Sequence, residues 1–345
     1  MNPVFNKNKV NPGAEKKVIF AVPGSKVYIS RHYRNKPNSF LNISLTGHNC
    51  DLMCSHCKAL LLKDMIDIDS GNSSGIKSCS EEKISGKTIK SNFGQNPDSG
   101  NLYEKNRIIK ILEKYGSDNV RGLLISGGFD KDGKLPLDDR ILGEIKQTRE
   151  KFGENIRIFL HLGFASSEVA KAVYECRIDG VLVNVFSDRH VIREVYNLEN
   201  CTPEMFYNNV KLLKESGLIV SPHLIIGLSD NGIAGEYESL KEISKIGVNS
   251  IVFAIAKRIT KHQEFKDLKI RACDIVSLYE YARELMPDTP IALGCAKPPG
   301  EKFEKAEIEL LDRGINTIAF PSEKTVDFAI KNDIEYTFTE QCCAI

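Results

Sequence analysis

The stretch Phe40–Lys58, FLNISLTGHNCDLMCSHCK, joins a short apolar run directly to a loop with three cysteines. Phe40–Thr46 combines β-branched and large apolar residues and ends at Gly47, which is the pattern of a buried strand followed by a turn. The cysteines follow with C-x3-C-x2-C spacing: Cys50, Cys54 and Cys57. This order predicts a cysteine loop at the carboxyl end of a strand.

The same strand pattern recurs along the chain, and a helical pattern of about ten to fifteen residues follows each run. Seven further runs are Arg121–Ser126, Ile156–Leu162, Gly180–Val185, Leu218–Ile226, Ser250–Ile255, Thr289–Gly294 and Asn316–Phe320. Eight strands alternating with helices predict an α/β fold, a (β/α)8 TIM barrel of parallel strands. The runs are apolar on both faces, as buried parallel strands are.

Between the runs lie amphipathic stretches with helix stop residues. In Pro203–Ser216, Phe206, Val210 and Leu213 fall three or four positions apart, Thr202 precedes the helix as a candidate cap, and Gly217 follows it. The same layout predicts two more helices, Tyr237–Ile246 before Gly247 and Lys305–Arg313 before Gly314.

Three segments fall outside this repeat, which we expect to span residues 40–330. Residues 1–39 contain one strand-like piece, Val18–Val22, and otherwise predict an extension wrapping the barrel. Asp69–Asn101 is rich in Ser, Gly, Asn and Lys, so we expect a mobile surface insertion or lid. Residues 331–345 form a C-terminal tail that carries Cys342 and Cys343.

Composition excludes several classes of protein. With 41% hydrophobic and 27% charged residues among 345, the chain is typical of a globular protein. Its 47 Lys plus Arg balance 46 Asp plus Glu, so no basic field favours nucleic acid as a partner. No apolar run reaches the roughly 20 residues that span a bilayer, and the first residues lack a signal-peptide core. We therefore expect a cytoplasmic protein without a membrane partner.

Ten cysteines in a reducing compartment favour metal binding or catalysis over disulfides. Three thiolates can hold three irons of a 4Fe–4S cubane and leave the fourth iron open to a substrate. One alternative is a structural zinc knuckle, with His56 or a distant cysteine as fourth ligand. Another is a thioredoxin-like motif over Cys54–Cys57, which leaves Cys50 unexplained.

At these residues the chain resembles the radical S-adenosylmethionine (SAM) superfamily, whose loop after the first strand carries this cysteine pattern. Ser126-Gly127-Gly128 resembles the family's glycine pair beside the methionine amino group of SAM. His223–Leu228 resembles the element that backs the adenine, through Ile225 and Gly227, with His223 replacing its first glycine. The resemblance implies that a reduced cluster cleaves SAM to methionine and a 5′-deoxyadenosyl radical that abstracts hydrogen.

The segment from Val183 to Gly227 is similar to biotin synthase and its full-barrel relatives. By this resemblance Asn184 faces the lumen and contacts the ribose or carboxylate of SAM; the alternative is a buried Asn bonded to neighbouring backbone. The same two interpretations, a lumen-facing contact or a buried side chain bonded to its neighbours, apply to His161, and we assign it no role as a base.

Three further cysteines suggest a second cluster. Cys295 lies in the stretch GCAKPPG at the end of the seventh run, and Cys342 and Cys343 lie in the tail. A tail folding back over the barrel mouth would join their thiols into a probable auxiliary iron–sulfur site. The alternatives are a small buried side chain for Cys295, a disordered end, and a prenylation box at Cys342–Ile345.

The full set of motifs resembles the two-component lipoyl synthases. That resemblance implies sulfur insertion into the octanoyl chain of a carrier protein or peptide, a possible homologous second subunit, and a low-potential electron donor such as ferredoxin or flavodoxin. The alternatives are a biotin-synthase-like maturase or mutase that acts on a small molecule without donating sulfur, and a non-catalytic zinc-binding barrel.

Overall fold

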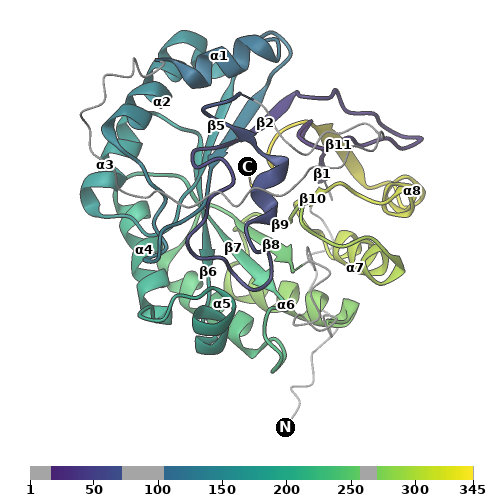
Figure 1. Ribbon diagram of the computed structural model, residues 1–345. Coiled ribbons are helices and arrows are strands. Elements are labelled where there is room, and N and C mark those ends of the chain that lie inside the picture. Colours follow the sequence, from purple (N-terminus) through teal and green to yellow (C-terminus); the bar gives the residue numbers. More distant parts are fainter. Residues whose placement is uncertain (1–16, 72–104, 257–269, 345) are drawn as a thin grey trace, which may run out of the picture.

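A computed structural model describes residues 17–71, 105–256 and 270–344. It contains one curled sheet of parallel strands with helices around its outer face (Figure 1). The strand order is β11-β1-β10-β9-β8-β7-β6-β5-β4-β2-β3. This arrangement confirms the predicted α/β, TIM-barrel-like class.

All eight predicted strands are present, and each lies beside the next one in the sequence. They are β2 (Phe40–Ser44), β4 (Gly122–Ser126), β5 (Arg157–His161), β6 (Gly180–Val185), β7 (Val220–Ile226), β8 (Ile251–Ile255), β9 (Ile291–Leu293) and β10 (Thr317–Ala319). Short connections through one helix keep sequential parallel strands adjacent.

Three more strands extend the sheet beyond the predicted eight. β1 (Lys17–Ala21) confirms the predicted strand-like piece Val18–Val22. It lies between β10 and β11 (Glu335–Thr339), so this part of the extension is an inner strand and does not wrap the sheet. β11 likewise makes part of the expected tail a strand. At the opposite edge, β3 (Ile66–Asp67) pairs with β2. Within the described ranges no ladder joins β3 to β11, so the sheet is open rather than a closed eight-stranded barrel.

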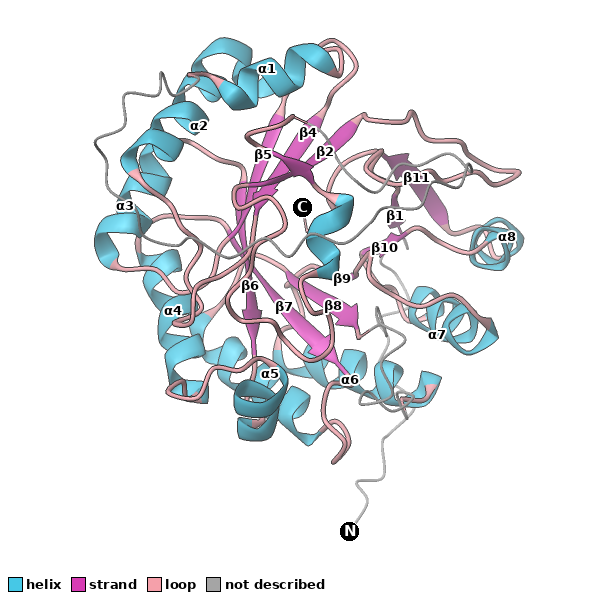
Figure 2. Cartoon of the chain, in the orientation of Figure 1, coloured by secondary structure: helices cyan, strands magenta, loops and turns pink. Residues whose placement is uncertain are grey.

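Eight α-helices of the described residues surround the strands in Figure 2. They are α1 (Arg107–Lys114), α2 (Asp139–Phe152), α3 (Ser167–Glu175), α4 (Pro203–Glu215), α5 (Ala234–Ile246), α6 (Ala272–Leu285), α7 (Glu301–Asp312) and α8 (Glu323–Lys331). Gly217, Gly247 and Gly314 follow helices with φ of 84°, 72° and 81°, as stop residues do. Thr202 lies at the start of α4, but its side chain makes no capping bond.

Two apolar clusters divide the interior. The larger fills the space between helices and sheet, whereas the smaller joins residues such as Phe40, Phe159 and Leu182. Leu124 belongs to the smaller cluster and its neighbours Leu123 and Ile125 to the larger. Because side chains alternate between the faces of a strand, the smaller cluster lies in the lumen of the curl.

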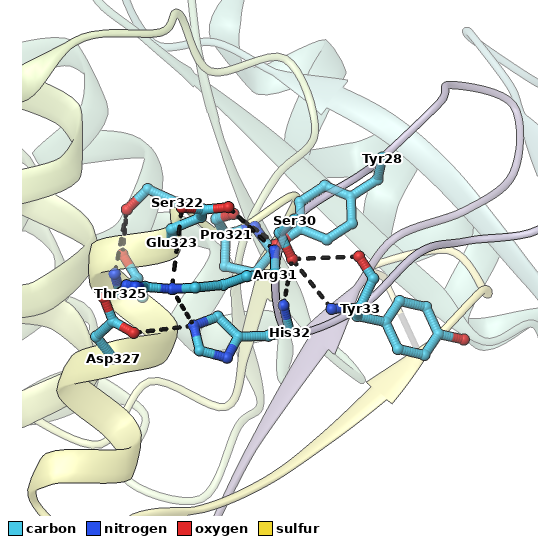
Figure 3. A network of polar contacts seen from close by, with 10 residues as sticks. All are labelled: Tyr28, Ser30, Arg31, His32, Tyr33, Pro321, Ser322, Glu323, Thr325 and Asp327. Carbon is cyan, nitrogen blue, oxygen red and sulfur yellow. Dashed lines mark hydrogen bonds and ion pairs between the residues drawn. The ribbon is translucent and has the colours of Figure 1, made fainter.

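The segment between β1 and β2 is fixed to α8 (Figure 3). Arg31 forms an ion pair with Asp327, and its backbone N–H donates to Glu323 Oε1 at 3.1 Å. His32 Nε2 lies 2.9 Å from Asp327 Oδ1, and the Tyr28 hydroxyl donates to the Pro321 carbonyl at 3.0 Å. These contacts hold the first and last parts of the described chain side by side.

Two further expectations can be compared with the described residues only in part. The predicted insertion Asp69–Asn101 lies outside the described residues from position 72 onward. In the described ranges, none of the helices has both the length and the apolar character needed to cross a bilayer.

Candidate active site

The cysteine loop follows β2 at the carboxyl end of the sheet, which is where TIM-like barrels place their chemistry. Gly47, with φ of 57°, turns the chain out of the strand. Cys50 is partly buried, and Cys54 and Cys57 are buried. The predicted position of the loop is therefore the one observed.

The loop after β4 holds one side of the cysteine loop. The Gly128 N–H donates to Thr46 Oγ1 at 2.6 Å, and the Asp51 N–H donates to the Phe129 carbonyl at 2.9 Å. The Phe129 N–H points at Cys50 Sγ over 3.4 Å. Such N–H···S bonds to a ligand sulfur are one means by which proteins tune an iron–sulfur cluster.

The close approach of these two loops explains the glycine at position 128. A Cβ there would meet Asn49 O at 1.8 Å and Cys50 Cα at 2.5 Å, which no side chain tolerates. Gly127 has looser surroundings, with Thr46 Oγ1 at 3.1 Å from its Cβ position. The structure thus gives Gly128 a role in docking the cysteine loop; the contact of this pair with SAM stays a prediction.

A second loop, after β6, holds the other side. Asn197 Nδ2 donates to the carbonyls of Leu52 at 2.5 Å and Met53 at 3.2 Å. The Ser55 N–H donates to the Val195 carbonyl at 2.8 Å. Asn197 adopts φ of 56°, a conformation that Asn tolerates better than most residues. The cysteine loop is therefore held between the loop after β4 and the loop after β6.

The three thiols of this loop interact with one another. A hydrogen bond with Cys57, together with burial, raises the pKa of the Cys54 thiol, and the charge of Cys50 adds to that rise. The hydrogen bond from Cys54 lowers the pKa of Cys57 to about 7. These effects place the Cys54 and Cys57 thiols close together and Cys50 within electrostatic reach of Cys54.

His56 lies between the second and third cysteines and faces Tyr196, with ring centroids 4.9 Å apart. Burial lowers the pKa of His56 to about 4, so its ring is neutral at pH 7. Its Nδ1 is buried without a hydrogen-bond partner. An unsatisfied buried nitrogen beside three thiols indicates that a further group belongs at this site.

The donor chemistry fits a 4Fe–4S cluster, since three thiolates suit three irons. In the part of the chain that the structure describes, no three His, Cys, Asp or Glu side chains are already spaced around one metal position. The Cys54 sulfur instead lies 3.8 Å from the Tyr196 carbonyl, to which it donates.

A polar wall faces the lumen just below the cysteine loop. Ser126 and His161 each lie two residues beyond a lumen-facing apolar residue, and their Oγ and Nδ1 atoms are 3.4 Å apart. His161 Nε2 lies 3.3 Å from Asn184 Oδ1, and its ring centroid lies 5.8 Å from that of His223. Ser126, His161, Asn184 and His223 are named the polar wall below.

The two predicted adenine-element residues lie at the end of β7. Gly227 has φ of 93°, and its N–H donates to Glu236 Oε1 at 2.9 Å. Burial raises the pKa of Glu236 to about 6. Ile225 lies two residues beyond His223 and faces the lumen with it. The fold thus brings both residues to the site edge, and their contact with adenine stays a prediction.

The second group of cysteines also meets. The nearby Cys343 thiol raises the pKa of the Cys295 thiol; at Cys343, Cys295 lowers the pKa and Cys342 raises it, so the three thiols lie close to one another. Cys295 is exposed after β9, whereas Cys343 is buried among the lumen-facing apolar residues. Lys26 donates to the Cys295 carbonyl over 3.3 Å. The predicted convergence of the three is observed, but the tail enters the lumen instead of covering its mouth.

Sequence patterns missed several residues that build the site. Asn197 lies inside the segment that is similar to biotin synthase but was given no role there, and Phe129, Tyr196 and Thr46 lacked any motif. Their contacts run between loops far apart in sequence, so only the strand order reveals them. Asn197 offered one local indication, because Asn often occupies positive φ.

No protein-family model matches this chain, and no curated protein is significantly similar to it. Its fold is similar to that of the FeFe-hydrogenase maturase HydG from Carboxydothermus hydrogenoformans, with TM-score 0.53, 14% identity, and coverage of 95% of this chain and 70% of that one. A second HydG structure gives TM-score 0.52 at 14% identity, covering 88% and 56%. Methylornithine synthase (PylB) gives 0.49 at 16% identity, covering 81% and 71%. At 14% identity, the TM-scores of the two HydG structures show a shared fold alone.

Proposed function

We propose that this chain is a radical SAM enzyme. The observation that carries the proposal is the position of Cys50, Cys54 and Cys57 on one loop at the carboxyl end of the first strand of a TIM-like sheet, β2. The solved structures of similar fold include radical SAM enzymes, which supports the superfamily. The alternative is a zinc-binding barrel without catalytic function, in which the unpartnered Nδ1 atom of His56 would supply the fourth ligand.

The residues of the site have separate tasks in this proposal. When bound, the cluster and SAM supply the one-electron cleavage that yields a 5′-deoxyadenosyl radical. Cys50, Cys54 and Cys57 hold the cluster, and the loops at Phe129 and Asn197 fix their backbone. Ser126, Asn184 and the backbone at Gly127 bind SAM from below, while Ile225 and Gly227 line its adenine.

The proposal extends to sulfur insertion of the lipoyl synthase type. Cys295, Cys342 and Cys343 would hold the auxiliary iron–sulfur cluster that donates sulfur, and their mutual contacts support this role. The substrate would be an octanoyl chain on a carrier protein or peptide. The proposed partners are a homologous second subunit and a low-potential donor, ferredoxin or flavodoxin, in the cytoplasm.

The deciding experiment is iron and sulfide quantitation after anaerobic reconstitution. Wild type should bind about eight irons, and Cys342→Ala/Cys343→Ala about four, the sums for two cubane clusters and one. About four irons in both proteins would contradict the auxiliary cluster. No iron in either would contradict the radical SAM assignment and favour zinc.

One observation favours a second candidate, a maturase or mutase that acts on a small polar molecule. The proposal for SAM leaves His161 and His223 of the polar wall unassigned. The hydrocarbon of an octanoyl chain cannot hydrogen-bond to these rings, whereas a small polar substrate would. Product analysis separates the two candidates. Sulfur-bearing octanoyl product from reconstituted wild type would support the first, and SAM cleavage coupled only to a polar substrate would support the second.

A further inference from the structure

The last described residues of the chain lie inside the sheet. Cys343 is 5% and Ala344 is 4% exposed, and both belong to the apolar cluster that they form with buried lumen-facing residues of seven strands. Among these are Phe40, Phe159 and Val252. The tail therefore occupies the interior that a closed barrel fills with its own side chains.

Two buried serines bind the backbone of this tail. The hydroxyls of Ser221, in β7, and Ser250, just before β8, lie 3.0 and 3.1 Å from the Ala344 carbonyl and donate to it. The two hydroxyls are also 2.6 Å apart, so either one can donate to the other instead of to Ala344. Since each hydroxyl has a single hydrogen, two of these three contacts are filled at any moment.

The burial of these serines shows why the contact matters. Ser221 is 1% and Ser250 is 5% exposed, within apolar surroundings. A buried hydroxyl is costly unless it is hydrogen-bonded. The Ala344 carbonyl satisfies the pair, and the pair in turn satisfies a carbonyl that the sheet does not bind.

The tail passes beside the start of β4 on its way into the lumen. Gln341 Nε2 donates to the Arg121 carbonyl at 3.1 Å. A Cβ on Gly122 would lie 2.8 Å from Gln341 Oε1 and 2.7 Å from the Phe40 ring. Glycine at this position therefore leaves space for the tail between β4 and β11.

We infer that Ser221 and Ser250 are positioning residues that lock the tail in the lumen and so hold the Cys343 thiol against Cys295. The lock fixes the residue next to Cys343, and the Gln341 contact fixes the chain two residues before it. This inference deepens the proposed function, on which the identity of an auxiliary cluster rests. The hydrogen bonds between the serines and the tail do not require a cluster, so the lock can be tested in protein without iron.

The test measures how fast the thiols react in reduced protein without iron. Iodoacetamide is added to native protein, and peptide mass spectrometry follows each cysteine, with the exposed Cys273 as internal reference. Cys343 should react at least about a hundredfold more slowly than Cys273 in wild type, because a buried thiol reacts only when the tail opens. If Cys343 and Cys273 of the wild-type protein reacted at equal rates, that result alone would overturn the lock.

The variant Ser221→Ala/Ser250→Ala should raise the Cys343 rate about tenfold or more, since both donors to the tail are lost. Cys273 should be unchanged. The matched control is Ser277→Ala, whose hydroxyl donates to the Asp274 carbonyl at 3.1 Å on α6, and it should leave Cys343 as in wild type. A folded double variant with the wild-type rate at Cys343 would overturn the inference.

If the double variant fails to fold, the two single variants replace it. Each should raise the Cys343 rate a few-fold, and wild-type rates in both would overturn the lock. Iron quantitation on the same proteins keeps the two proposals apart. A wild type with about four irons and a slow Cys343 would end the auxiliary-cluster proposal and leave the lock standing, whereas a fast Cys343 beside about eight irons would do the reverse.

Discussion

Two groups of three cysteines are built in opposite ways. Cys50, Cys54 and Cys57 lie on one short loop, and hydrogen bonds from the loops after β4 and β6 hold that loop from outside. Cys295, Cys342 and Cys343 come from two distant parts of the chain and meet because the tail enters the lumen. The first group depends on local loop docking and the second on the whole sheet being assembled.

The largest expected effect falls on the first group. Cys54→Ala leaves two thiolates, which hold a cubane cluster poorly, so SAM cleavage should fall to background. The measurement is 5′-deoxyadenosine formed per enzyme by the reconstituted, reduced protein. Cys176→Ala removes a buried thiol between helices and is the matched control; it should keep cleavage. Normal cleavage by Cys54→Ala would show that this loop does not hold the radical cluster.

The same substitution in the second group should separate two activities. Cys342→Ala should leave SAM cleavage intact and remove sulfur-bearing product, because it touches only the proposed auxiliary site. Both quantities are measured in one reaction. Wild-type amounts of product from this variant would mean that the second group does not supply sulfur.

The docking of the first group can be broken without touching a cysteine. Gly128→Ala places a Cβ 1.8 Å from Asn49 O, so the loops must separate, at a cost of about 2–4 kcal/mol in unfolding free energy. Reconstituted iron should fall with it. Gly143→Ala is the control, since its Cβ meets nothing within 4 Å and sits in α2; it should be neutral or stabilising by up to about 1 kcal/mol. Equal stability of the two variants would contradict the docking role.

A smaller effect is expected from the other clamp. Asn197→Ala loses two hydrogen bonds to the cysteine loop and puts a side chain at φ of 56°, whereas Asn197→Gly loses only the hydrogen bonds. Alanine should cost roughly 2 kcal/mol of unfolding free energy, and glycine should recover part of that. Denaturant unfolding measures both, and a glycine variant less stable than alanine would contradict this account.

The first group and most of the fold follow from sequence alone. Eight strands were located because buried parallel strands leave clear apolar runs, and the cysteine loop because three thiols with short spacing follow one of them. β3 has two residues, and β11, EYTFT, alternates polar and aromatic residues without the pattern of the central runs. Neither segment offered a comparable indication.

The route of the tail was beyond any local pattern. The sequence analysis expected the terminal cysteines to lie near Cys295, but no pattern in residues 341–344 indicates that this segment passes beside Gly122 and ends on two serines. Those contacts depend on which strands become neighbours, as does the polar wall. Long-range packing decides them, and residue spacing does not encode it.

The smallest expected effect concerns the space between the two groups. Burial, together with the neighbouring His161, lowers the pKa of His223 to about 3. An unfolded histidine has a pKa of about 6.5, so between pH 6.5 and 3 the unfolded chain binds more protons and stability declines as pH falls. His223→Gln should reduce that decline by at most about 1.4 kcal/mol per pH unit, less where lumen water reaches the ring. Unfolding free energies at pH 7 and 5.5 test this, and equal slopes for both proteins would contradict it.

The place of β1 in the sheet also constrains how the molecule is made. Ile19 pairs with Thr317 on one side and Thr337 on the other. During synthesis β1 leaves the ribosome long before β10 and β11, and such long-range pairing is slow and leaves an edge exposed. The sheet can therefore form around β1 only after every strand from β2 to β9 has been made.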